Sequence, residues 1–149
     1  MNEDERFHPI DQAVEDIRAG RIVIVVDDAD RENEGDFIMA AEAVTPEAIN
    51  FMATHGRGIV CLPLEGSRLD ELHIPLMVAS KAGSHETAFA VSIDARGTTT
   101  TGTSAFDRAT TIRAVCQPET LPEDISMPGH VFPLRAHDGG VLKLSLIHI

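Results

Sequence analysis

The spacing of apolar residues near the start of the chain changes from that of a helix to that of a strand. After Pro9, apolar residues recur every three or four positions until Gly20, which predicts a helix of about three turns. Those residues are Ile10, Ala13, Val14 and Ile17. Residues 21–26 carry a continuous β-branched run, typical of a strand buried on both faces, and residues 37–41 predict a second strand.

The middle of the chain repeats this change of spacing. Thr45, Pro46 and Glu47 supply a hydroxyl cap, a proline at the first helical position and an acid in the first turn. Gly56 is placed to end that helix, and residues 58–63 predict another buried strand.

Weaker patterns follow over residues 67–94. A short helix is expected over 67–72 and a loop over 80–86. Phe89, Val91 and Ile93 then alternate with smaller or polar residues, which indicates a half-buried strand.

A Thr/Gly loop precedes the next predicted helix. Residues 98–102 are four threonines and a glycine, and they lead into a capping-box pattern from Ser104 to Asp107. The helix is expected to run to about Cys116. Its apolar face would carry Phe106, Ala109, Ile112 and Cys116. Backbone N–H groups and hydroxyls of such a loop, Thr101 and Ser104 included, are candidates for holding an anion such as phosphate.

The last patterns complete the prediction of the fold. Residues 121–128 resemble a loop, and residues 130–135 an edge strand, because Pro133 cannot donate a ladder hydrogen bond. Strands and helices alternate with short loops and one alternating strand. The predicted class is therefore α+β, with a mixed β-sheet packed against helices in an α/β sandwich.

Composition limits the classes of protein that fit. The chain has 149 residues and a net charge of −12, so a nucleic-acid partner is not expected. It has two cysteines, no signal-peptide pattern, and no apolar run near the roughly 18 residues of a membrane span. We expect one cytoplasmic domain without a membrane partner, preceded by a disordered segment at residues 1–8.

The negative charge is concentrated in one short segment. Fourteen of the 24 acidic residues lie within residues 1–50, and six of them fall within residues 27–36. As a calcium loop starting at Asp30 this segment fails, because position 12 is Ala41 and the preceding element is a strand. A solvated acidic turn and a site for Mg²⁺ both remain open.

Four motifs in order resemble the 3,4-dihydroxy-2-butanone 4-phosphate synthase family. They are residues 27–36 (DDADRENEGD), 58–62 (GIVCL), 100–108 (TTGTSAFDR) and 128–136 (PGHVFPLRA). The resemblance implies that family's fold over residues 9–142. It also implies a lyase of riboflavin biosynthesis that converts D-ribulose 5-phosphate to 3,4-dihydroxy-2-butanone 4-phosphate and formate.

The resemblance also implies a set of site residues and a cofactor. His130 is the expected catalytic histidine, Arg31, Glu32 and Asp36 are expected to contact the sugar phosphate, and Glu32 is expected to bind Mg²⁺ or Mn²⁺. Glu34 is a further candidate acid. The family also implies a homodimer, and it places Cys61 near the substrate, although a core thiol is the simplest interpretation of that residue. The histidines outside these motifs keep a structural or surface role.

The resemblance ends at residue 142. The family continues with a Gly-His-Thr-Glu stretch whose histidine is a metal ligand, whereas residues 143–149 do not match it. The sequence therefore resembles a truncated domain, and we expect it to bind Mg²⁺ and substrate poorly and to be marginally soluble. A non-catalytic acidic cation-binding module and an inactive fragment are the alternatives to the lyase.

Overall fold

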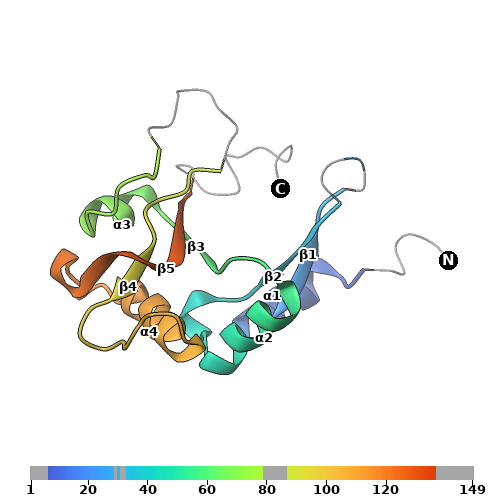
Figure 1. Cartoon of the computed structure of the whole chain (residues 1–149). Helices are drawn as coiled ribbons and strands as arrows, with labels where there is room; N and C mark the ends of the chain where they lie inside the picture. The colour runs from blue at the N-terminus through green and yellow to red at the C-terminus, as the bar shows by residue number, and fades with distance from the viewer. Residues whose placement is uncertain (1–6, 29, 31–32, 79–86, 137–149) are drawn as a thin grey trace.

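A computed structural model describes residues 7–28, 30, 33–78 and 87–136 of the chain (Figure 1). The loop expected over 80–86 and the final residues 143–149 lie outside these residues, as does most of the segment 1–8. Arg31 and Glu32 also lie outside them.

The first elements form a hairpin preceded by a helix. Helix α1 (Ile10–Arg18) ends before Gly20, whose φ of 72° lies in the left-handed region that favours glycine. Strand β1 (Val23–Val26) pairs antiparallel with β2 (Gly35–Ile38), and the acidic turn lies at the tip of this hairpin in Figure 1.

The prediction that residues 21–26 are buried on both faces is wrong. Ile24 is 65% exposed, and Val25 and Val26 are also exposed. Among the described residues, β1 has β2 as its one strand neighbour. An apolar β-branched run therefore forms a strand here that stays largely exposed.

Helix α2 (Pro46–Gly56) follows a short 3-10 helix, η2 (Ala41–Ala43). The Thr45 hydroxyl accepts a hydrogen bond from the Ala48 N–H at 3.1 Å, which confirms the predicted cap. The left-handed residue that ends α2 is Arg57, with φ of 56°, rather than Gly56.

A three-stranded mixed sheet forms the other part of the fold (Figure 1). Its strand order is β3 (Cys61–Leu64), β5 (Ile125–Arg135) and β4 (Ile93–Ala95), with β5 parallel to β3 and antiparallel to β4. Helix α3 (Gly66–Glu71) follows β3 directly. The sheet and its helices confirm the predicted α+β class.

The expectation that residues 130–135 form an edge strand is wrong, because β5 is the central strand. Phe132 donates its N–H to Val60 of the β3 side, whereas the backbone of Pro133 faces the opposite side. There the Pro133 carbonyl accepts a hydrogen bond from the Ala90 N–H. The segment that contains Ala90 forms only an isolated bridge with β5, between Phe89 and Leu134. A proline is tolerated because its missing donor faces this sparsely paired segment. The strand also begins at Ile125, within the segment expected to be a loop.

Helix α4 (Ala105–Cys116) packs against α2 and against strands β4 and β5, and a 3-10 turn, η3 (Pro122–Asp124), leads from it into β5. The prediction that Phe106 lies on the buried face of α4 is wrong, since it is 59% exposed. Asp107 and Thr111 are buried there instead, because each forms hydrogen bonds with neighbouring segments.

The hydrophobic core is formed by residues from the helices, the three-stranded sheet and the segments between them. They are Val44, Ile49, Leu62, Leu69, Leu72, Ile74, Ala90, Ile93, Ala109, Ile112, Val115, Ile125 and Val131.

Within the described ranges, no helix is long and apolar enough to cross a membrane.

Candidate active site at the β4–β5 bulge

An irregularity in the pairing of β4 with β5 creates the site. Ile93 pairs with Val131, but the next residue, Asp94, pairs with Ser126, so residues 127–130 bulge out of the ladder. Gly129 lies directly against β4, because a Cβ there would come within 2.1 Å of the Ile93 carbonyl carbon. Its N–H donates to the Ser92 hydroxyl at 3.1 Å, so the bulge is held closely on the sheet.

His130 occupies the end of this bulge and is bound by both oxygens of Asp94. The backbone N–H of His130 donates to Asp94 Oδ1 at 3.0 Å, and its Nδ1 lies 2.8 Å from Asp94 Oδ2. On the other side of the ring, Nε2 lies 3.2 Å from the hydroxyl oxygen of Thr103. The Asp94 side chain is 12% exposed and that of His130 is 43% exposed. The imidazole is therefore accessible to solvent, and its Nδ1 contacts a mostly buried carboxylate.

The Thr/Gly loop before α4 is ordered by Asp107. The N–H and hydroxyl of Thr100 and the N–H of Gly102 all donate to the Asp107 carboxylate, at 3.1, 2.8 and 3.1 Å. These bonds, above all the one from the Thr100 hydroxyl, lower the pKa of Asp107 in spite of its burial. Ser104 accepts from Asp107 N–H at 3.0 Å and so caps the helix as predicted.

That N–H groups and hydroxyls of this loop hold an anion stays a prediction, but fewer of its N–H groups are available for it. Two of the N–H groups that could bind an anion, those of Thr100 and Gly102, already bind Asp107. The acid at the third helical position thus turns back to the loop instead of completing a capping box with Ser104. Thr101 and Thr103 remain exposed at the loop surface.

The described part of the acidic segment lies on the other sheet. Glu34 and Asp30 donate their N–H groups to the side chains of Asp27 and Asp28, at 2.7 and 2.9 Å, which shapes the turn. Asp36 is exposed on β2. Arg31 and Glu32 fall outside the described residues.

The Asp36 carboxylate acts electrostatically on Cys61 of β3. Burial raises the pKa of the half-buried Cys61 thiol, and the Asp36 carboxylate raises it further. Asp36 and Cys61, which come from different motifs, therefore interact electrostatically. The structure places His130 with Asp94 and Thr103 on the three-stranded sheet.

The chemistry of the acidic turn fits a hard divalent cation. Exposed carboxylates at Asp28, Asp30, Glu34 and Asp36 are the oxygen donors that Mg²⁺ prefers, together with its own waters. Among the described residues, no three His, Cys, Asp or Glu side chains are gathered closely enough to hold a metal ion. A set of three such ligands would therefore include residues outside the described ranges.

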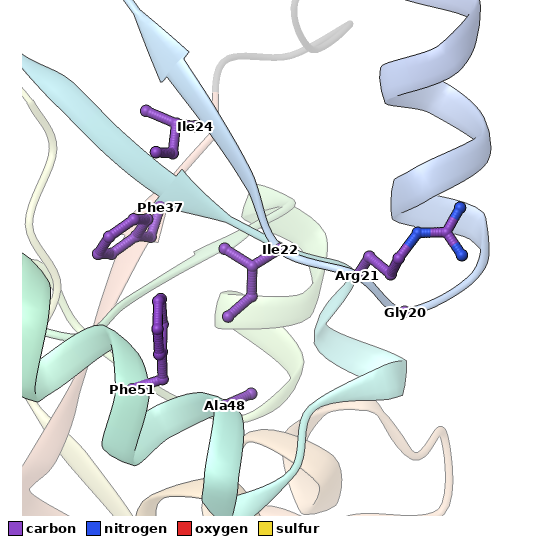
Figure 2. Close-up of a pocket in the computed structure, with 7 residues that line it drawn as sticks. All are labelled: Gly20, Arg21, Ile22, Ile24, Phe37, Ala48 and Phe51. Carbon is purple, nitrogen blue, oxygen red and sulfur yellow. The ribbon is translucent and has the colours of Figure 1, made fainter.

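A shallow groove of about 390 Å³ lies away from His130, between the β1–β2 hairpin and α2. Figure 2 shows the rings of Phe37 and Phe51 facing each other across it, with centroids 5.4 Å apart. Arg21 points away from the groove and pairs with Asp16. The groove is lined mainly by apolar groups and offers no titratable cluster as a candidate site.

Sequence reasoning identifies His130 but not its two partners. Asp94 falls at a polar position of an alternating pattern, where a carboxylate is expected to face water. In the structure Ala90, Ser92 and Asp94 are buried as well as Ile93, so the segment is covered on both sides. Thr103 lies 27 positions from His130, and no local pattern connects them.

The mixed sheet, its helices and the Asp94–His130 pair define an α+β protein with a histidine held in position by a carboxylate. Residues 11–145 match the model of the family described as 3,4-dihydroxy-2-butanone 4-phosphate synthase. The chain belongs to this family, as its four motifs indicate.

Curated relatives and solved structures agree with this assignment. Riboflavin biosynthesis protein RibBA of Cytophaga hutchinsonii is 56% identical over 139 residues, which cover 93% of this chain and 34% of the relative. The protein of the same name from Synechocystis sp. is 58% identical, covering 92% of this chain and 25% of the relative. The chain thus spans about a quarter to a third of these relatives.

Two solved structures share the fold. A 3,4-dihydroxy-2-butanone 4-phosphate synthase in complex with two magnesium ions superposes with a TM-score of 0.84 at 46% identity, covering 91% of this chain and 63% of that chain. RibBX of A. baumannii, a two-domain 3,4-dihydroxy-2-butanone 4-phosphate synthase, gives a TM-score of 0.83 at 50% identity, covering 91% and 40%.

Proposed function

We propose that this chain carries the lyase activity of its family, the conversion of D-ribulose 5-phosphate to 3,4-dihydroxy-2-butanone 4-phosphate and formate in riboflavin biosynthesis. The observation that carries the proposal is the Asp94–His130 pair at the β4–β5 bulge, within a chain of this family. Enolisation, dehydration, skeletal rearrangement and release of a one-carbon acid each require proton transfer, which a positioned imidazole supplies near neutral pH.

His130 takes the catalytic role in this proposal. A carboxylate only accepts hydrogen bonds, so the 2.8 Å contact with Asp94 places a proton on Nδ1. Nε2 then has a free lone pair on the exposed side of the ring, where it accepts from Thr103 and can exchange a proton with substrate.

The acidic turn takes the binding role. Arg31, Glu32 and Asp36 are proposed to contact the sugar phosphate, and Glu32 to bind the cation. The exposed carboxylates near Asp36 support a hard cation, and one related synthase is described with two magnesium ions. When bound, Mg²⁺ or Mn²⁺ would polarise carbonyl and hydroxyl oxygens of the substrate.

The alternative is an acidic cation-binding module without activity. It gives no role to the His130 imidazole that Asp94 holds at the bulge. Isothermal titration of Mg²⁺ with and without D-ribulose 5-phosphate separates the two. The lyase predicts that each ligand strengthens binding of the other, whereas the module predicts that Mg²⁺ affinity is independent of the sugar phosphate.

We also propose that the protein acts in the cytoplasm as a homodimer. The family resemblance and the free cysteines, Cys61 and Cys116, support this proposal. Sedimentation equilibrium of the purified chain tests the dimer, since the mass should be twice 16.1 kDa.

A further inference from the structure

We propose that Asp94 is a positioning residue that fixes the tautomer of His130, so that the ring carries its proton on Nδ1 and presents an unprotonated Nε2. The inference deepens the proposed function and rests on it for its effect on turnover. The tautomer itself is a property of the folded chain and can be measured without substrate.

The first support is that both oxygens of one carboxylate bind one residue. Asp94 Oδ1 accepts from the His130 backbone N–H at 3.0 Å, and Oδ2 lies 2.8 Å from Nδ1. The backbone N–H is a donor at every pH, so Oδ1 is committed to it. Oδ2 is left to accept from the ring, which requires the proton on Nδ1. An isolated imidazole, by contrast, exchanges between two tautomers.

The second support is that the carboxylate cannot move away from the ring. Asp94 is buried on β4, and its carbonyl accepts from the Ser126 hydroxyl at 3.2 Å. The adjacent Ala95 N–H donates to Thr111 of α4 at 3.0 Å. On the far side, Gly102 approaches so closely that a Cβ there would lie 2.0 Å from Asp94 Oδ2. The sheet, helix and loop together confine the carboxylate.

The third support is the asymmetry of the two ring nitrogens. Nδ1 faces the mostly buried carboxylate, whereas Nε2 faces a single hydroxyl, that of Thr103, 3.2 Å away at the exposed side. A hydroxyl can donate or accept, so Thr103 adapts to either tautomer. Asp94 alone among these contacts dictates where the proton lies.

Asp94→Asn gives a sharp test, because an amide offers one acceptor where the carboxylate offers two. The amide oxygen is required by the His130 N–H, so the NH₂ group would face Nδ1 and donate to it. The ring must then carry its proton on Nε2. We therefore expect the tautomer to switch from Nδ1–H to Nε2–H, as read from long-range ¹H–¹⁵N spectra recorded as a pH series up to alkaline pH.

Three further measurements complete the experiment. Thr103→Val should retain the Nδ1–H tautomer, since it leaves Asp94 in place. Asp94→Asn should lower kcat for formate release on the order of 100-fold, with KM changed less than about threefold, because proton transfer and not binding is lost. Glu119→Gln, an exposed carboxylate remote from the bulge, serves as the control and should match the parent chain.

The outcomes are distinguishable from failure of the proposed function. An Nε2–H tautomer in the parent chain would overturn the inference, as would an Nδ1–H tautomer retained by a folded Asp94→Asn variant. If Asp94→Asn does not fold, the His130 tautomers of the parent chain and of Thr103→Val still test the inference. A chain that shows the predicted tautomers but releases no formate would contradict the lyase proposal and leave the role of Asp94 in fixing the ring intact.

Discussion

Gly102 lies directly against the Asp94 carboxylate. A Cβ at that glycine would overlap its neighbours, at 2.0 Å from Asp94 Oδ2 and 2.6 Å from His130 Nδ1. The loop that opens helix α4 therefore touches the pair at the β4–β5 bulge. A small residue is required here for two separate reasons, a positive φ of 82° and the absence of space.

Gly102→Ala should destabilise the protein more than the left-handed backbone alone explains. Strain at a positive φ costs about 1 kcal/mol, and overpacking against the mostly buried Asp94 carboxylate adds about 1–3 kcal/mol. Gly97→Ala is the matched control, because Gly97 has a φ of 78° but a Cβ added there would meet no atom within 4 Å. Urea unfolding of both variants measures the difference, and equal losses of stability would contradict the close contact.

Asp107 should make stability depend on acid pH. Its pKa in the folded chain lies below the usual 3.8, mainly because the Thr100 hydroxyl donates to it. Its contribution is therefore complete above 3.8 and is lost as the pH falls below that value toward the folded pKa.

Thermal unfolding of the parent chain and of Asp107→Asn between pH 6 and pH 2.5 tests this dependence. The variant should be less stable at pH 6, and the gap between the two should narrow in acid. A gap that stays constant over this range would show that the Asp107 charge does not hold the loop.

Asp36 should control the reactivity of Cys61. The Asp36 carboxylate is one of two causes that raise the pKa of this thiol, after burial. Asp36→Asn should therefore lower that pKa and speed alkylation by iodoacetamide at a fixed pH near 8, because the thiolate reacts. The measurement uses a Cys116→Ser background, and Asp28→Asn is the control. An unchanged alkylation rate would contradict an effect of the Asp36 carboxylate on the Cys61 thiol.

Arg68 should stabilise the end of helix α4. Its guanidinium donates to the carbonyls of Val115, Gln117 and Thr120, at 3.2, 2.5 and 3.4 Å. Arg68→Met keeps the aliphatic stem but leaves these acceptors without their donor, so we expect a loss of about 2 kcal/mol in urea unfolding. Arg113→Gln, exposed on the same helix, should change stability by less than about 0.5 kcal/mol.

Local features of the fold can be predicted from the sequence. The caps at Thr45 and Ser104 depend on residues three positions away, and both form as expected. His130 is identified through its motif. Each of these depends on residues that are close together in the sequence, so a single sequence is enough to predict it.

Long-range features cannot be predicted in the same way. The central place of β5 depends on which strands pair with it, and Pro133 is accommodated by the sparse pairing on one side. The role of Asp94 depends on a register shift that brings it to a histidine 36 positions away. Thr100 and Gly102 lose their anion-binding capacity to Asp107 through side-chain geometry that hydrophobic patterning does not encode.

Formate release from D-ribulose 5-phosphate is the most direct test of the central claim. With Mg²⁺ present, the 149-residue chain should release formate, slowly, and His130→Asn should reduce the rate on the order of 100-fold while binding of the sugar phosphate is retained. Absence of formate from the folded parent chain, or an equal rate in the folded His130→Asn variant, would contradict the account.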